Sequence, residues 1–281
     1  MDKEMKPIIE SYNEDEEWLY NKPYLFIKGY ATGRNFSNTL KALPLARKIH
    51  DGQYRNGTVI VNGKEVQLPY IIHVLKVCST LMSLNLPLSE YELDILYATA
   101  ICHDMIEDRP DLFTNGGEEL TTKYFLDENI YNAVKLLSKQ SKLDEYQLNE
   151  YFNNLKHNKF ALLVKLADRS HNVETLSVMK IERLHKYVDE TRRWIYPLCS
   201  YGKQNYPELS NGFTILKAKI VSLTEETEVL VEMFSEKLRE KEREIVELRQ
   251  RLETEKNYNY ERMFDEMQQI QEEKGIDNND A

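Results

Sequence analysis

Residues 101–108 read ICHDMIED and place a histidine directly beside an aspartate, with two further carboxylates one helical turn later. Another histidine lies upstream in the sequence, and another aspartate lies downstream. Two imidazoles and two carboxylates from three segments are enough to hold one divalent metal ion. The candidate ligands are His73, His103, Asp104 and Asp168. The pattern is typical of a metal-dependent hydrolase, for which phosphate esters are the commonest substrates.

The chemistry of these ligands favours a transition metal. Mixed imidazole and carboxylate ligation suits Mn²⁺, Fe²⁺ or Zn²⁺ better than Mg²⁺ or Ca²⁺. The three cysteines are scattered without the paired spacing of a structural zinc site, which argues against such a site. A bound ion would lower the pKa of a water ligand and neutralise phosphate oxygens. We expect Glu107 or Asp108, the leftover acidic pair, to orient that water or carry its proton.

A second stripe of polar residues follows the last candidate ligand. Asp168, Asn172 and Thr175 are separated by four and three positions, which places a carboxylate, an amide and a hydroxyl on one face of a helix. Such a stripe can anchor a nucleotide beyond the metal. A cluster of basic residues upstream would form a positively charged entrance to the site for a small nucleotide: Lys41, Arg47, Lys48 and Arg55.

Other side chains near the motifs are expected to be structural. We expect His50 and His171 to be structural histidines of the core whose ring nitrogens have hydrogen-bond partners. We expect Tyr70 to pack against its neighbours in the core. His157 and His185 lie among charged residues and are expected to be solvated.

Composition narrows the class of protein. The chain has 281 residues and a net charge of −10, which argues against binding a nucleic-acid polymer because phosphate neutralisation needs a basic surface. No apolar run is long enough to span a membrane, and the N-terminus lacks a signal pattern. Three cysteines without metal-binding spacing suggest buried free thiols in a reducing cytoplasm. We expect a cytoplasmic protein with a small-molecule substrate.

The apolar spacing predicts an all-α fold with one small β-hairpin. Residues 1–35 show no clear period and are expected to form an irregular arm. The hairpin is predicted at 58–68, around the turn-forming pair Asn62-Gly63. Ser89 is the expected N-cap of the helix that carries the first motif. Helices are predicted at 37–54, 70–84, 89–108, 118–139, 144–155, 159–178 and 180–197.

The C-terminal part is a charged helix. A loop at 204–212 is the expected boundary, the helix is predicted over 213–272, and residues 273–281 are expected to be disordered. Its apolar residues fit about three heptads: Val231, Phe234, Leu238, Ile245, Leu248 and Leu252. We expect a homo-oligomer formed through this coiled-coil segment. A single solvated helix, a foreign partner and docking on the body of the chain are the alternatives.

Four ordered motifs resemble those of the RelA/SpoT-type HD hydrolases. They are ARKIHDGQYR at 46–55, PYIIH at 69–73, HDMIED at 103–108 and VKLADRSHNVETL at 164–176. Residues 190–202 also resemble the helix that ends the hydrolase region of that family, so the similarity covers roughly 37–202. Nothing after residue 203 resembles the family's synthetase domain.

The resemblance implies a function and a set of roles. It implies an HD-domain helical bundle over 36–203 and a Mn²⁺-dependent 3′-pyrophosphohydrolase of guanosine tetra- and pentaphosphate alarmones, which releases GDP or GTP and pyrophosphate. Fe²⁺ and Zn²⁺ are alternative ions. By motif position the metal ligands correspond to His73, His103, Asp104 and Asp168, the catalytic acids to Glu107 and Asp108, and the substrate-binding residues to Arg55, Asn172 and Thr175.

The chain also departs from the family pattern. Asn56 stands where the family usually has a basic residue, the interval from Arg55 to His73 is longer, and Val74 replaces a proline. These departures leave two alternatives open. One is an HD phosphohydrolase of another nucleotide, such as an adenosine alarmone or NADPH, and the other is a non-enzymatic module that senses a nucleotide.

Overall fold

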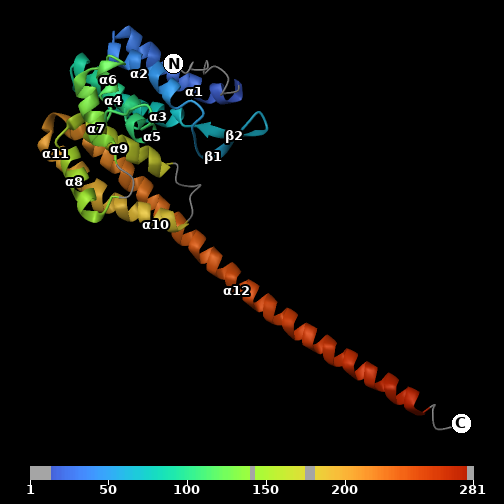
Figure 1. The fold of residues 1–281 in the computed structure, drawn as a ribbon. Coiled ribbons are helices and arrows are strands. Elements are labelled where there is room, and N and C mark those ends of the chain that lie inside the picture. The colour runs from blue at the N-terminus through green and yellow to red at the C-terminus, as the bar shows by residue number, and fades with distance from the viewer. Residues whose placement is uncertain (1–13, 140–142, 175–180, 277–281) are drawn as a thin grey trace. The chain divides into compact units, whose positions relative to one another are not determined.

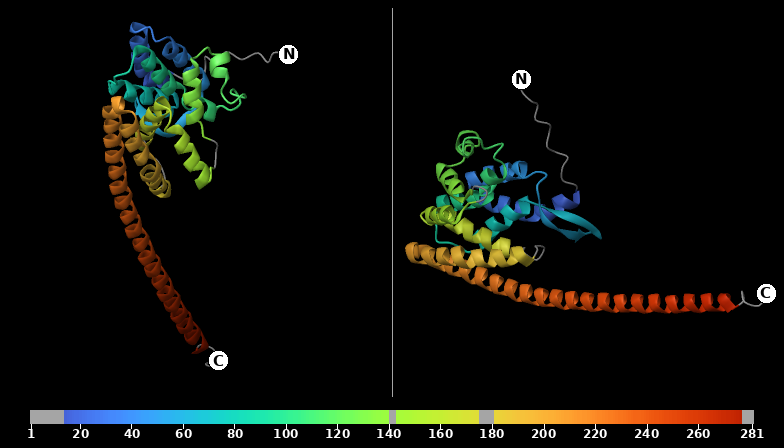
Figure 2. Two further views of the ribbon diagram at one scale, coloured as in Figure 1. Left: turned by 90° about the vertical axis from the view of Figure 1, so that its left-hand side faces the viewer. Right: turned by 60° about the horizontal axis from the view of Figure 1, so that its bottom comes forward.

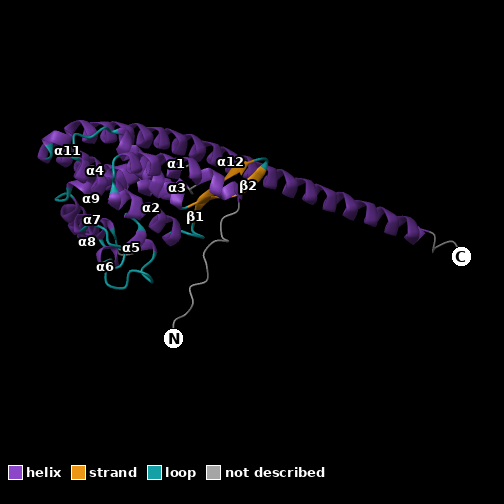
Figure 3. Ribbon diagram, turned by 90° about the horizontal axis from the view of Figure 1, so that it is seen from above, coloured by secondary structure: helices purple, strands orange, loops and turns teal. Residues whose placement is uncertain are grey.

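The structure is a computed structural model that describes residues 14–139, 143–174 and 181–276. Helices make up most of the described chain, and the strands form one antiparallel hairpin (Figure 3). The expected all-α fold with a small hairpin and a long C-terminal helix is therefore confirmed. None of the described helices is long and apolar enough to cross a membrane. Thr175 lies outside the described residues.

The chain divides into two compact units, Met1–Glu228 and Val229–Ala281. The first unit contains the elements of the helical domain (Figure 1). In chain order these are α1 (Glu14–Gly33), α2 (Ser37–Ile49), β1 (Tyr54–Val61), β2 (Lys64–Pro69), α3 (Ile71–Ser83), α4 (Glu90–Cys102), α5 (Met105–Asp108), α6 (Glu119–Thr122), α7 (Glu128–Leu137), α8 (Glu145–Leu155), α9 (Lys159–Glu174), α10 (Ile181–Glu190), η2 (Thr191–Ile195), α11 (Tyr196–Asn205) and η3 (Pro207–Leu209). The last helix, α12 (Ser210–Ile276), extends through the boundary into the second unit and is continuous in both views of Figure 2.

Helix α4 is the central element of the first unit. Residues 93–102 are all buried, and α4 packs against α2, α3, α7 and α9. A helix that is covered on every side shows no amphipathic period, and its sequence here is apolar nearly throughout. Its start is fixed by the predicted cap: Ser89 and Glu92 form a reciprocal capping box. Glu92 also pairs with Lys159 at 2.6 Å, which ties the start of α4 to the start of α9.

The helix predicted over 89–108 is interrupted, and this prediction was wrong in its second half. Helix α4 ends at Cys102, and the short helix α5 begins only at Met105. The ring nitrogen Nδ1 of His103 lies 2.8 Å from the carbonyl oxygen of Ala100, in the last turn of α4. Since the carbonyls of a last helical turn lack partners within the helix, the imidazole takes one of them and marks the end of α4.

The hairpin forms around the predicted turn. Asn62 and Gly63 both have positive φ, at 51° and 77°, as a type I′ turn requires. Val61 is paired with Lys64 across it. The first strand starts at Tyr54, earlier than predicted, so it carries Arg55.

Three other parts differ from the expected pattern. Residues 14–33, expected to be irregular, form α1, whose Tyr20 and Ile27 are buried in the core. The helix predicted at 118–139 is divided into α6 and α7, because Asp127 caps a new helix. The expected break at Pro197 does not occur, since a proline is tolerated in the first turn of a helix and Pro197 lies in that position of α11.

The first part of α12 belongs to the first unit. Phe213, Leu216 and Ile220 are buried in the core, and the boundary between the units follows Glu228. The segment expected at 213–272 is therefore divided between the units. The predicted free thiols are confirmed, since all three cysteines are buried and unbonded: Cys78, Cys102 and Cys199.

A buried carboxylate joins α2 to α4. Asp94 of α4 accepts hydrogen bonds from the backbone N–H groups of Asn38 and Thr39 at 3.0 and 2.8 Å. The Thr39 hydroxyl and the Asn38 amide donate to it as well, at 2.7 and 3.0 Å. These residues lie in the first turn of α2, which has no side-chain cap of its own. Asp94 therefore satisfies the helix N-terminus and places a negative charge at its positive end.

We predict that Asp94→Asn destabilises the protein by about 2–5 kcal/mol, because buried donors lose a charged acceptor and an amide replaces one oxygen. Urea unfolding followed by circular dichroism measures this loss. Asp111→Asn is the control, since Asp111 forms an exposed ion pair with Arg109 and its loss should have a much smaller effect. Equal stability of Asp94→Asn and wild type would show that the carboxylate does not hold α2.

Candidate metal site

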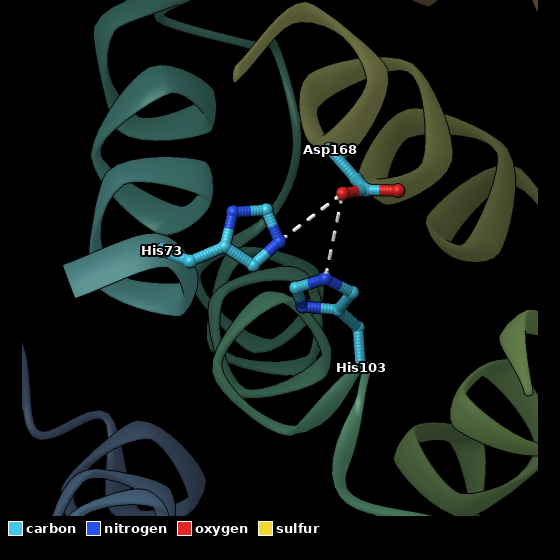
Figure 4. Close-up of side chains that lie close together, drawn as sticks. All are labelled: His73, His103 and Asp168. Carbon is cyan, nitrogen blue, oxygen red and sulfur yellow. Dashed lines mark ion pairs between the residues drawn. The ribbon is translucent and has the colours of Figure 1, made fainter. Parts of the chain in front are cut away.

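Three helices bring two histidines and an aspartate together in the first unit (Figure 4). His73 comes from the first turn of α3, His103 from the end of α4 and Asp168 from the middle of α9. The Oδ1 atom of Asp168 lies 3.2 Å from Nε2 of His73 and 3.8 Å from Nε2 of His103. All three residues are buried, and one ligand atom of each lies within 4.8 Å of the others. This cluster fits a metal site.

The fourth predicted ligand lies beside this cluster. The Oδ2 atom of Asp104 is 3.0 Å from Nε2 of His103 and 3.4 Å from Nε2 of His73. The Tyr70 hydroxyl donates a hydrogen bond of 2.6 Å to the same oxygen. The residues that the sequence singled out as ligands are therefore neighbours, and their role as ligands remains a prediction.

The ring of His103 has one nitrogen turned to the backbone and one turned to the cluster. Because Nδ1 faces the carbonyl of Ala100, it carries a proton and donates. The Nε2 atom is buried and has no hydrogen-bond partner of adequate geometry among the described residues. An imidazole fixed in this way presents a nitrogen lone pair to a metal ion, which is the usual arrangement of a metal-ligating histidine.

His73 is oriented in a similar way by another imidazole. Its Nδ1 lies 2.7 Å from Nδ1 of His171. Burial, together with the charges of the nearby His73 and Arg55, lowers the pKa of His171 to about 3, so the His171 ring is neutral. A neutral His171 can accept a hydrogen bond from Nδ1–H of His73. Nε2 of His73 then faces Asp104 and Asp168.

The electrostatics of the cluster call for positive charge. Burial alone would raise the pKa of Asp104 and Asp168, but the neighbouring cations and histidines hold both well below the usual range. Burial likewise lowers the pKa of His103, but the charges and hydrogen bonds of the two aspartates outweigh it and raise it to about 10. Lys165 adds a buried ammonium 3.2 Å from Oδ2 of Asp168. Without a metal ion, protons on the imidazoles supply this positive charge. A bound divalent cation would supply it instead.

The predicted acidic pair lies on α5, next to the cluster. Burial, together with the charges of Asp104 and Glu107, raises the pKa of Asp108 to about 6. Burial also raises the pKa of Glu107, although the backbone N–H of Lys139 donates to its Oε2 at 3.0 Å and opposes this. A carboxyl group whose pKa lies near neutrality can both accept and release a proton at physiological pH.

Two of the predicted substrate-binding residues are joined to the cluster by hydrogen bonds. Arg55 of β1 donates from Nη2 to Oδ1 of Asn172 at 2.8 Å, and Asn172 donates from Nδ2 to Oδ1 of Asp168 at 2.5 Å. The guanidinium also lies 5.9 Å from the ring centre of Tyr70. The third predicted residue, Thr175, is outside the described residues.

Two other basic residues of the expected entrance have partners elsewhere. Lys41 donates to the backbone carbonyl of Phe125 at 2.8 Å, and Arg47 pairs with Glu17 on α1. Of these residues, Arg55 is the one that the structure connects to the cluster.

Sequence reasoning missed three side chains that contact the predicted ligands. Tyr70 bonds to Asp104, Lys165 pairs with Asp168, and His171 contacts His73. Tyr70 lies three positions before a predicted ligand, and Lys165 and His171 lie three positions on either side of another. Residues at that spacing share a helix face, so examining the i±3 neighbours of the ligands would have found them. His50, also expected to be structural, stacks on Tyr70 with ring centres 4.9 Å apart.

Residues 70–173 match the family model described as HD domain. The chain is 29% identical over 168 residues to the guanosine-3′,5′-bis(diphosphate) 3′-pyrophosphohydrolase of Borreliella burgdorferi, covering 57% of this chain and 22% of that protein. It is 30% identical over 222 residues to the GTP pyrophosphokinase of Myxococcus xanthus, covering 72% of this chain and 27% of that protein. It is 27% identical over 193 residues to the bifunctional (p)ppGpp synthase/hydrolase SpoT of Escherichia coli, covering 65% and 24%.

The chain thus spans about a quarter of the length of these curated relatives. The HD domain and the resemblance to RelA/SpoT-type proteins, both expected from the motifs, are confirmed.

We predict that the protein binds Mn²⁺ through this cluster. After removal of bound metal with a chelator, calorimetric titration should show that His103→Ala and Asp168→Ala bind Mn²⁺ at least ~10²-fold more weakly than wild type, since even outer partners of ligands contribute 10- to 100-fold. His157→Ala is the matched control, because His157 is exposed and its substitution should leave Mn²⁺ binding unchanged.

The same titration tests the fourth ligand. We expect Asp104→Ala to lose Mn²⁺ binding to the same extent as His103→Ala. Normal binding by Asp104→Ala would restrict the ligands to the other three residues, and normal binding by His103→Ala would place any metal elsewhere.

Proposed function

We propose that this chain, which carries an HD domain related to those of RelA/SpoT-type proteins, is a metal-dependent 3′-pyrophosphohydrolase. Its substrates would be guanosine 3′,5′-bis(diphosphate)-type alarmones, and its products GDP or GTP and pyrophosphate. The observation that carries the proposal is the continuous set of contacts from Arg55 through Asn172 to the His73, His103 and Asp168 cluster. Asn172 therefore connects Arg55, the cation proposed to bind phosphate, to the proposed metal site through one hydrogen bond on each side.

The names of the relatives support the substrate class. Proteins that are 27–29% identical to the matched region are named as 3′-pyrophosphohydrolases of guanosine-3′,5′-bis(diphosphate). The match includes the helices that supply the cluster, since the HD domain spans 70–173. The hydrolase role rests on this similarity together with the intact acidic pair on α5.

His73, His103, Asp104 and Asp168 would hold the ion. When bound, a divalent metal neutralises phosphate oxygens and lowers the pKa of a water molecule. Tyr70 and Lys165 fix the two carboxylates, because each binds an oxygen of Asp104 or Asp168. The ligands are therefore preorganised by their neighbours.

The acidic pair would move the protons. Hydrolysis breaks the bond between the 3′ oxygen and phosphorus, and the oxygen of water joins that phosphorus. One proton of the water has to leave, and the 3′ oxygen has to gain one. Glu107 and Asp108 have raised pKa values, which suits one carboxyl group to accept the proton and to return it.

Arg55 would bind the substrate. A guanidinium binds phosphate oxygens in a bidentate manner, and this one lies at the start of the hairpin, held by Asn172.

The position of Arg55 on β1 also favours a second candidate function. Because the substrate-binding cation is carried by the hairpin, a different hairpin would fit a different nucleotide, such as an adenosine alarmone or NADPH.

A panel of nucleotides distinguishes these functions. Purine nucleotides with a 3′ diphosphate, their 3′-monophosphate analogues and NADPH are each incubated with the Mn²⁺-loaded protein, and released pyrophosphate and phosphate are measured. We expect pyrophosphate from guanosine 3′,5′-bis(diphosphate) and none after chelation. Faster turnover of NADPH or an adenosine substrate would replace the proposed one. Binding of nucleotide and metal with no turnover in the whole panel would indicate a sensing module.

We predict that Glu107→Gln keeps metal and nucleotide binding but turns over at least ~10²-fold more slowly, since general acid–base help contributes 10² to 10⁴. Single-turnover kinetics with Mn²⁺ measures the chemical step. Glu118→Gln, an exposed glutamate outside the site, should react at the wild-type rate. Wild-type turnover in Glu107→Gln would assign the proton transfer to Asp108 or to solvent.

Arg55→Ala should weaken nucleotide binding and leave Mn²⁺ content unchanged. We expect a loss of about 1.5–3 kcal/mol, the range for hydrogen bonds to a charged group, which is about 10- to 100-fold in Kd. Equilibrium dialysis with nucleotide and metal analysis of the same sample separate the two effects. Lys41→Ala is the control, because its ammonium binds the carbonyl of Phe125. Unaltered nucleotide affinity in Arg55→Ala would give Arg55 a structural role only.

A further inference from the structure

The second unit presents a row of large apolar side chains to solvent. This row, called the seam here, consists of Phe234, Leu238, Ile245, Leu248 and Leu252. Each of these side chains is 48–56% exposed in the single chain. Monomeric proteins seldom expose a continuous apolar patch of this kind, so the seam is a candidate interaction surface.

The seam has the spacing of a two-stranded coiled coil. Leu238, Ile245 and Leu252 repeat every seven residues at position a, while Phe234 and Leu248 occupy position d. The remaining d position between them is Lys241.

The ends of the seam are defined by burial and by charge. Val231, which continues the heptad toward the N-terminus, is only 1% exposed in the single chain and is not open to a partner. Toward the C-terminus the next d positions are Glu255 and Arg262, which do not belong in an apolar interface. The expected coiled-coil segment therefore narrows to residues 234–252.

The charges beside the seam select a partner of the same sequence in parallel orientation. In a parallel pair, a residue at position g faces the residue five positions later on the partner. Lys237 would then face Glu242, and Glu244 would face Arg249, so both contacts join opposite charges and occur twice by symmetry. All four side chains are exposed, and Glu244 also pairs with Lys241 of its own chain at 2.6 Å.

The antiparallel arrangement is disfavoured by the same charges. The antiparallel register that keeps the whole seam in contact would place Glu244 against Glu244, Glu242 against Glu242 and Lys237 against Arg251. All three contacts join like charges, which destabilises the pair. Other antiparallel registers bury Lys241 or Glu255 against leucines and shorten the apolar contact.

We propose that the seam is the interface for a second copy of this chain, which docks as a parallel, in-register coiled coil over residues 234–252. Lys241 limits its strength, because a lysine at position d faces its own copy. In the single chain this ammonium lies 2.6 Å from Glu244, which offsets part of the repulsion. The interface is independent of the metal site, and the two assignments are tested separately.

Sedimentation equilibrium of the full-length protein at micromolar concentrations tests the interface. We expect twice the mass of one chain for wild type and at least ~10-fold weaker association for Leu248→Lys, because a second charge enters the seam. Val246→Lys is the matched control: Val246 is 53% exposed on the same helix but lies at position b, so its dimer should persist. A monomeric wild-type chain, or equal loss in both variants, would overturn the proposal.

Two further variants test the role of Lys241 and the orientation. Lys241→Leu should strengthen association at least ~10-fold, a gain that misfolding cannot imitate. Leu248→Cys should form a disulfide-linked dimer on mild oxidation, because the two copies of residue 248 meet in a parallel, in-register pair, whereas the antiparallel register of the whole seam places residue 248 against Leu238. Val246→Cys should not. A dimer in which Leu248→Cys fails to cross-link, or in which Lys241→Leu weakens association, would overturn the proposed parallel seam.

Discussion

Helix α4 is buried on every side and ends inside the protein, so the carbonyl groups of its last turn need partners from the chain itself. His103 fulfils this need with Nδ1, which binds the carbonyl of Ala100. The same bond determines the tautomer of the ring and turns Nε2 toward Asp104 and Asp168. One requirement of the fold, the satisfaction of a buried helix end, thereby directs a buried ring nitrogen into a cluster that fits a metal site.

The second requirement is electrostatic. Two carboxylates with depressed pKa values share a buried space with two imidazoles, and each carboxylate also has a fixed donor, Tyr70 for Asp104 and Lys165 for Asp168. Such an arrangement is stable only when positive charge is present, as protons on the rings or as a bound cation. The surrounding polar residues are thus part of the site, because they hold the carboxylates in the orientation that a cation requires.

The sequence predicted which residues lie together better than it predicted the backbone that brings them together. The predicted ligands, Arg55 and Asn172 are neighbours in the structure, and their roles stay predictions. The break after Cys102 was not predicted, since it arises from a ring-to-carbonyl bond and no glycine or proline marks it. Helix α1 was missed because its exposed face carries the apolar residues Trp18, Leu25 and Phe26, which obscure the helical period of its buried residues Tyr20, Ile27 and Ala31.

Helix α12 shows why apolar spacing does not by itself define an interface. Phe213, Leu216 and Ile220 have the same three- and four-residue spacing as the seam, yet they are buried in the core of their own chain. What differs is the composition of the flanking positions. Beside the seam, Lys237 and Glu242 have opposite charges at the spacing that a parallel copy requires, and so do Glu244 and Arg249, whereas a helix that packs on its own domain has no need of such a pattern. The flanking charges, together with the exposed fractions of the apolar residues, therefore distinguish the part of α12 that completes the core from the part that we propose as an interface.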